Sequence, residues 1–177
     1  MKKILFLFIL SLSLSAWTPA SRSERESKYI LKETKKAISS TFKIERFLLE
    51  QENILLTSSA FLTEHSIFKI NTETDSIGYA IVATAPSKTD SFEYLLLLDS
   101  SLSLKKVKVL IYREDYGGEI SSKRWLSQFL KSDNDDTYVY GDNISAISGA
   151  TISVKSITAS INDVMDSIRT LQSQNKI

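Results

Sequence analysis

A four-residue turn, Ser148-Gly149-Ala150-Thr151, has the residue types that can hold a phosphate group. Glycine permits a tight turn, alanine adds almost no bulk, and Thr151 presents a hydroxyl group where a long helix is expected to begin. The first amides of a helix have no partner within it and are suitable donors to an anion. We therefore predict that the amides of Gly149 to Ser153, including that of Ile152, surround a phosphate. The alternative is that Thr151 or Ser153 merely caps the helix.

A second stretch, Tyr116-Gly117-Gly118-Glu119, has residue types that suit contact with a planar ring. Two consecutive glycines let the backbone approach such a ring, and the side chains of Tyr116 and Trp125 can cover its face. The alternative is a turn between a strand and a helix, followed by a tryptophan in the core. The residue types alone leave both interpretations open.

Both stretches resemble signatures of the FMN-binding domain family, which occurs in subunits of bacterial Rnf and sodium-translocating NADH:quinone reductase complexes and in small secreted proteins. Members carry Ser-Gly-Ala-Thr or a close variant, and the final Thr is often esterified to the phosphate of FMN. A Mg²⁺-dependent FAD:protein FMN transferase makes that bond and releases AMP. The resemblance implies that Thr151 carries FMN, that Ser148, Gly149 and Ala150 form the preceding turn, and that Ile152 and Ser153 begin the following helix.

The resemblance extends from about Phe68 to the C-terminus. The family's second signature is a Glu, then a turn containing Gly, then a short helix with an aromatic residue and Gln-Phe; Glu114 and Gly117 match it. The resemblance implies a flavin-pocket role for residues of this stretch, namely Glu114, Tyr116, Gly117, Gly118, Glu119 and Trp125. Ser145 stands where the family usually has Asp, so flavin binding is implied more directly than covalent attachment.

The elements that must position these residues indicate an α+β domain. Apolar residues at steps of three and four predict a long C-terminal helix with one buried face: Val154, Ile157, Ile161, Val164, Ile168 and Leu171. Short apolar runs separated by turn residues predict about four or more antiparallel strands, at 68–70, 77–82, 92–98 and 106–111. Ser121 or Ser122 is expected to cap a short helix that ends at Leu130. The expected fold is an antiparallel sheet packed by the long C-terminal helix and the short helix.

The N-terminal third is divided by composition. Residues 1–20 have two lysines, an apolar core and small residues, as in a secretory signal peptide. Residues 21–66 are expected to form a helical or irregular extension, with a helix over about 21–40 and either helix or strand over 41–56. Residues 67–177 are expected to form the FMN-binding domain. An uncleaved membrane anchor is the alternative to cleavage, although the apolar core is short for a membrane span.

Charge and composition narrow the classes of function. Removal of Lys2 and Lys3 with the leader changes the formal net charge from +1 to −1, which argues against binding to nucleic acid. The chain contains no cysteine, which excludes disulfides, thiol chemistry and a lipid-bearing cysteine. We expect a soluble protein outside the cytoplasm, periplasmic or secreted.

Other candidate sites are weaker. His65 is the single histidine and lacks a second ligand, so we expect no metal site and no Ser-His-Asp arrangement. The acidic run 133–136 lacks the glycine and glutamate that a calcium loop needs, and is interpreted as a solvated turn.

The function that these patterns favour is electron transfer by bound FMN rather than a stand-alone oxidoreductase, since no nicotinamide motif is visible. Its redox partner is unidentified, with a membrane-bound protein as one candidate. Two alternatives stay open. One is a non-catalytic binding or sensory module with non-covalent flavin or none, and the other is a structural protein with a degenerate site.

Overall fold

The architecture is one antiparallel sheet between helices. The computed structural model describes residues 22–54, 56, 64–130 and 137–177. Five strands pair in sequence order, each antiparallel to the next: β1 (Leu48–Glu52), β2 (Glu64–Asn71), β3 (Ser76–Pro86), β4 (Ser91–Asp99) and β5 (Leu104–Ile111). The predicted α+β class with an antiparallel sheet is confirmed.

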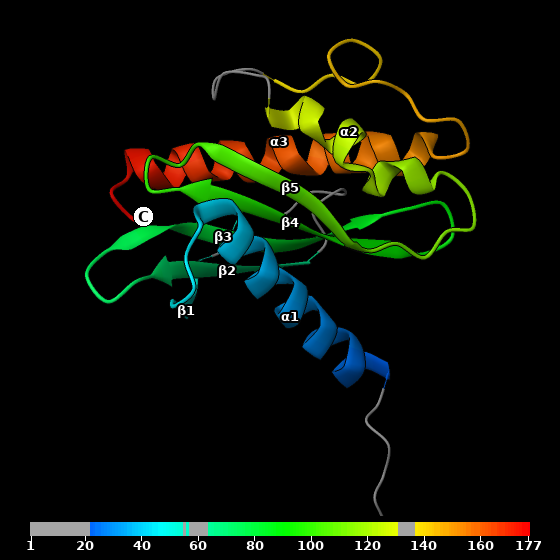
Figure 1. Ribbon diagram of the computed structural model, residues 1–177. Coiled ribbons are helices and arrows are strands. Elements are labelled where there is room, and N and C mark those ends of the chain that lie inside the picture. Colours follow the sequence, from blue (N-terminus) through cyan, green and yellow to red (C-terminus); the bar gives the residue numbers. More distant parts are fainter. Residues whose placement is uncertain (1–21, 55, 57–63, 131–136) are drawn as a thin grey trace, which may run out of the picture.

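The long helix α3 (Thr151–Ser173) covers one face of this sheet (Figure 1). The predicted apolar stripe lies in the core, where five of its six members are buried and Leu171 is partly buried. Alternate residues of β4 face the helix, because successive side chains of a strand point to opposite faces. One of them, Tyr94, pairs its hydroxyl group with Ser160 Oγ of α3 at 2.6 Å, which gives this buried phenol a polar partner.

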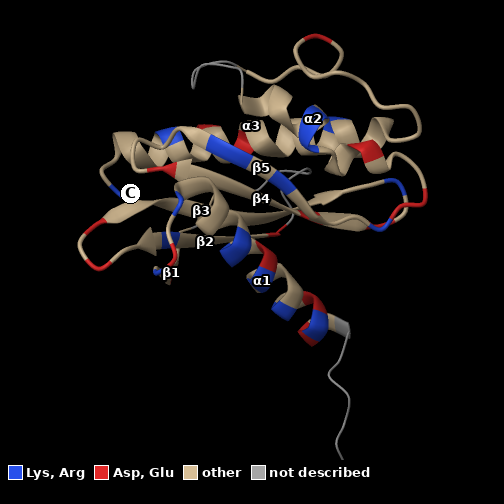
Figure 2. Cartoon of the chain, in the orientation of Figure 1, with Lys and Arg blue, Asp and Glu red and all other residues tan. Residues whose placement is uncertain are grey.

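Helix α1 (Arg22–Phe42) covers the opposite face, so the domain has three layers (Figure 1). The other alternate residues of β4, Leu95 and Leu97, pack here with Ala37 and Ile38 of α1. Basic and acidic residues are interspersed along this helix (Figure 2). None of the described helices combines the length and apolar character that a membrane crossing requires.

An arginine just after β5 ties α1 to the sheet. Arg113 Nη1 lies 2.9 Å from a carboxylate oxygen of Glu93 on β4, and its Nη2 lies 3.0 Å from one of Glu26 on α1. Nη1 also donates to the carbonyl group of Ser91 at 2.8 Å. These carboxylates raise the pKa of Arg113. Because Arg113 joins three elements, the chain that follows β5 starts from a fixed position.

One short helix was predicted after β5, and the structure has a short α-helix there between two 3-10 turns. Ser122 is the N-cap of α2 (Lys123–Leu126), and its side chain accepts from the amide of Trp125 at 3.2 Å. A 3-10 turn, η1 (Gly118–Ser121), precedes α2, and a second one, η2 (Ser127–Leu130), follows it. The cap at Ser122 is as predicted, but the α-helix ends at Leu126, and the 3-10 turn η2 continues the chain to Leu130, where the helix was expected to end.

The region that sequence left undecided contains the end of α1 and the edge strand β1. Lys43 adopts a left-handed φ of 56°, which ends the helix. The side chain of Leu48 is 74% exposed, and this edge strand lacks the clean alternation that identifies a half-buried strand. The proposed signal segment and the acidic run 133–136 lie outside the described residues.

Candidate functional site

The two stretches singled out from sequence are in contact. Gly117 has a φ of 76°, and a β-carbon built on it would lie 2.3 Å from Ala150 Cβ. Gly149 has a φ of 78°, and a β-carbon there would lie 3.3 Å from Tyr116 Cβ. Both positions need glycine for a left-handed backbone, and Gly117 needs it for space as well. The loop around Gly117 thus packs directly on the turn that precedes α3.

The short helix α2 and the 3-10 turn η2 hold the chain that leads into this turn. Trp125 Nε1 donates to the carbonyl group of Ser145 at 2.9 Å, and Gln128 Oε1 accepts from the Ser145 amide at 2.9 Å. The indole is 6% exposed and meets Phe129 edge-on, with the ring centroids 5.4 Å apart. A buried side chain therefore holds the chain just before the turn in place.

A pocket of about 300 Å³ opens where the loop and the turn meet. Seven predicted site residues line it: Glu114, Tyr116, Gly149, Ala150, Thr151, Ile152 and Ser153. Lys88 and Tyr112 line it too, and neither was a sequence candidate. The volume is at the lower end of the range typical of small-molecule and cofactor sites.

Thr151 is the first residue of α3, as predicted, and its side chain is exposed in this pocket. No described residue accepts from the amides of Thr151, Ile152 and Ser153, whereas the amide of Ala150 is used in a turn to the Ile147 carbonyl group at 3.2 Å. Three backbone donors and the positive end of the helix dipole therefore converge on one end of the pocket.

The alternative in which Thr151 or Ser153 caps this helix is wrong. Ala150 occupies the N-cap position, because its carbonyl group accepts from Val154, and it offers no side-chain oxygen. Thr151 and Ser153 already lie within the first turn. Ser153 is buried and its Oγ accepts from the Tyr112 hydroxyl group at 3.1 Å, so this serine joins α3 to the end of β5.

Glu114 is engaged with the loop between β3 and β4. Its carboxylate accepts from Ser87 Oγ at 2.6 Å, from the Thr89 amide at 2.7 Å and from Thr89 Oγ1 at 2.9 Å. Donors to the charged form favour ionisation, and together they lower the pKa of Glu114 to about 2. The carboxylate is thus an anion that is already well supplied with donors.

The strand register explains this contact. Glu93 of β4 pairs with Ile111 of β5, so the start of β4 and the end of β5 lie at the same edge of the sheet. Residues just before β4 therefore face residues just after β5. A link between residues 87–90 and Glu114 follows from antiparallel pairing, yet sequence does not reveal which side chains meet.

The remaining candidates lie beside the pocket rather than in it. Ser148, Glu119 and Trp125 line a second cavity, of about 350 Å³, with Ser145 and Arg124. Gly118 has open space where a β-carbon would be placed. The structure thus brings the candidates together around the turn before α3, but divides them between two neighbouring cavities. The predicted stacking of Trp125 on a ring stays a prediction.

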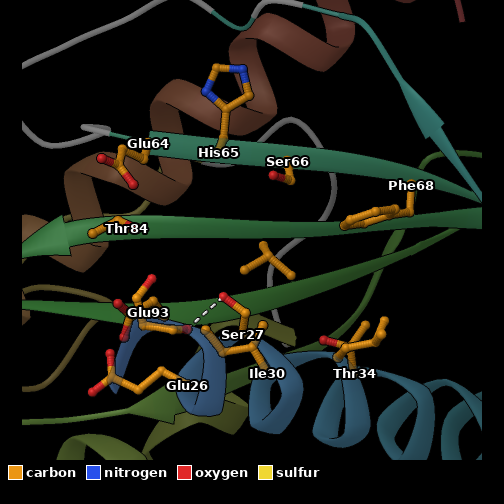
Figure 3. A pocket seen from close by; sticks show the side chains of 13 residues that line it. Glu26, Ser27, Ile30, Thr34, Glu64, His65, Ser66, Phe68, Thr84 and Glu93 are labelled. Atoms are coloured by element: carbon orange, nitrogen blue, oxygen red, sulfur yellow. Dashed lines mark hydrogen bonds between the residues drawn. The ribbon is translucent and has the colours of Figure 1, made fainter. Parts of the chain in front are cut away.

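A larger groove, of about 520 Å³, lies on the other face of the sheet, between α1 and strands β2 to β4 (Figure 3). His65 lines it, and its Nε2 accepts from the amide of Leu56 at 3.2 Å. Within the described ranges, no group of three His, Cys, Asp or Glu residues could hold a metal ion. The sheet separates this groove from Thr151.

The pocket around Thr151 therefore combines a hydroxyl group, three free amides and one cationic side chain, Lys88. This donor set suits a phosphate group, and the apolar or aromatic side chains of Ile152 and Tyr116 can flank a planar ring beside it. No curated protein matched the chain in a sequence search. Residues 89–166, which include Glu114, the Gly117 loop and Thr151, match the family model described as FMN-binding domain, so the chain carries an FMN-binding domain and its cofactor is FMN.

Proposed function

We propose that this protein carries electrons outside the cytoplasm by means of FMN bound through a phosphoester to Thr151. The observation that carries the proposal is the exposed hydroxyl group of Thr151, located in the pocket beside three amides without a described acceptor. A phosphate ester at this oxygen would lie at the positive end of α3, where an anion is stabilised.

Attachment requires FAD and a separate Mg²⁺-dependent FMN transferase. In that reaction Thr151 Oγ forms a bond to the phosphorus atom on the flavin side of the FAD pyrophosphate, the bond between the two phosphates breaks, and AMP leaves. The hydroxyl proton passes to solvent or to a base of the transferase. Accessibility of Thr151 supports this reaction, because a second enzyme must reach the oxygen.

The surroundings of the pocket favour electron exchange with another protein. Tyr116 is 77% exposed and Ile152 is 51% exposed, so a ring that packs against them lies near the surface, within reach of a redox partner. The flavin supplies the redox chemistry, while these residues orient its ring and adjust its environment. Covalent attachment would also keep the cofactor on an exported protein, whose secretion is supported by the leader-like residues 1–20.

The experiment that tests the proposal is intact-mass measurement on protein from the native host or from co-expression with a flavin transferase. We expect a gain of one FMN less one water, and flavin fluorescence that persists after denaturation. Thr151→Ala should abolish both. Its matched control, Ser148→Ala, removes a neighbouring hydroxyl group of the same turn and should retain them. A yellow protein that releases its flavin on denaturation would instead favour the non-covalent binding module.

A further inference from the structure

Lys88 is the one lysine or arginine that lines the Thr151 pocket within the described residues. It lies in the loop between β3 and β4, and its side chain is exposed. A lysine at a surface loop is usually mobile, because its long side chain has many rotamers. The backbone on either side of Lys88 is nevertheless held by several contacts.

Glu114 holds both neighbours of Lys88 in sequence. Its carboxylate accepts from the side chain of Ser87 and from both the amide and the hydroxyl group of Thr89. The Ser87 amide also donates to the Asp90 carbonyl group at 2.8 Å, and the Ser87 hydroxyl oxygen lies 2.8 Å from the same carbonyl oxygen. Ser156 Oγ of α3 donates to the carbonyl group of the preceding residue, Pro86. Glu114 and α3 thus fix the base of the Lys88 side chain beside the helix start.

We propose that Lys88 is the cationic partner of the FMN phosphate group and that Glu114 is a positioning residue, which acts by holding the loop that carries Lys88. This inference rests on the proposed function, because it places the phosphate at Thr151.

The charges around the pocket favour this assignment over a contact between Glu114 and the flavin. Glu114 brings a negative charge to the same wall that the phosphate would approach, and like charges in one site repel each other. Lys88 compensates that charge. The carboxylate of Glu114 already accepts three hydrogen bonds from the loop, and as an acceptor it has no proton to donate to the phosphate.

The test compares two flavins that differ only in the phosphate. Apoprotein produced without a transferase is titrated with FMN and with riboflavin at low ionic strength, and flavin fluorescence is recorded. Lys88→Gln should weaken FMN binding about fivefold, as expected for a partly exposed ion pair, and leave riboflavin binding unchanged. Lys88→Arg should restore most of the preference for FMN.

Lys155→Gln is the matched control, because this exposed lysine lies in the second turn of α3 but does not line the pocket. It should change the FMN preference little. Glu114→Gln should reduce the preference, but by less than Lys88→Gln does, because it also removes a negative charge from the pocket wall; the double variant should be no worse than Lys88→Gln alone. A purely structural role for Glu114 would instead weaken both flavins equally.

A second measurement uses the covalently loaded protein. The ³¹P resonance of the phosphoester should shift in Lys88→Gln and stay in place in Lys155→Gln. The proposal for Lys88 is overturned if Lys88→Gln keeps the wild-type preference for FMN over riboflavin, or keeps the wild-type ³¹P resonance. If the wild-type protein takes up FMN neither reversibly nor covalently, the proposed function itself is refuted. The wild-type measurement shows this outcome before any variant is compared.

Discussion

Replacement of Gly117 by alanine tests the central geometric feature of the site, which is the packing of the glycine loop on the turn before α3. The new methyl group would lie 2.3 Å from Ala150 Cβ and 3.1 Å from Ala150 Cα, where ordinary contacts are 3.4 Å or more. The backbone at Gly117 is also left-handed, with a φ of 76°. We expect Gly117→Ala to destabilise the domain and to lower flavin loading, because the loop and the turn must separate.

The size of the effect follows from three contributions. A left-handed backbone costs an alanine about 1–2 kcal/mol, and overpacking of a buried contact costs about 1–3 kcal/mol. The lower entropy of the unfolded alanine chain offsets about 0.4–1 kcal/mol. The free energy of unfolding should therefore fall by about 1–5 kcal/mol, which lowers Tm by about 2–20 °C for a chain of this size.

The assay is urea denaturation of apoprotein, with two comparisons. Gly118→Ala is the matched control: no atom lies within 4 Å of its β-carbon position, so its effect should be small. Ala150→Gly removes the clashing methyl group, so the double variant Gly117→Ala/Ala150→Gly should lose at least about 1 kcal/mol less than the sum of the single changes. Equal stabilities of the Gly117→Ala and Gly118→Ala proteins, or strictly additive effects at 117 and 150, would refute the contact.

Two further predictions concern residues of the same pocket. Glu114 has a pKa of about 2 in the folded protein against an ordinary value of 4.5, so its contribution to stability is complete above pH 4.5 and is lost as the pH falls towards 2. The difference in unfolding free energy between wild type and Glu114→Gln should therefore shrink over that range. A difference that does not depend on pH would contradict the hydrogen-bonded carboxylate. Tyr116→Ala should leave flavin attached and change the free energy of unfolding by less than about 0.5 kcal/mol, because the residue is 77% exposed. It should nevertheless shift the absorption bands or the reduction potential of the flavin. A spectrum and potential identical to wild type in spectroelectrochemistry would remove Tyr116 from the flavin site.

The fold was predictable where one face of an element is buried. Steps of three and four residues predicted α3, and all but one member of the predicted stripe is buried. β1 was left undecided, because an edge strand with an exposed Leu48 lacks an alternating pattern. The packing of α1 on the second face was not predicted. Both faces of β4 are buried, and a run such as Leu95 to Leu98 does not show which element covers which side.

The parts of the site that were predictable are those that depend on residues close together in sequence. The glycine turn at 149 and the start of a helix at Thr151 depend on neighbours in sequence, and the structure has them as expected. The packing of Gly117 on Ala150 was not predicted. Lys88 and Tyr112 were not predicted as site residues, because it is the pairing of β4 with β5 that brings their part of the chain to the pocket. Lys88 stands in a polar loop whose composition indicates only a turn.

The segment that matches the FMN-binding domain begins at residue 89, yet the contacts that organise the pocket extend beyond it. Ser87 is one of the donors to Glu114, and Glu26 of α1 holds Arg113, the residue immediately before Glu114. Arg113 faces α1 and Glu114 faces the pocket, so two successive residues connect opposite sides of the sheet. Arg113 contacts Glu26 of α1, and Glu114 contacts residues on both sides of Lys88. The helix before the matched segment is therefore connected to the pocket through Arg113 and Glu114, although it lies on the other face of the sheet.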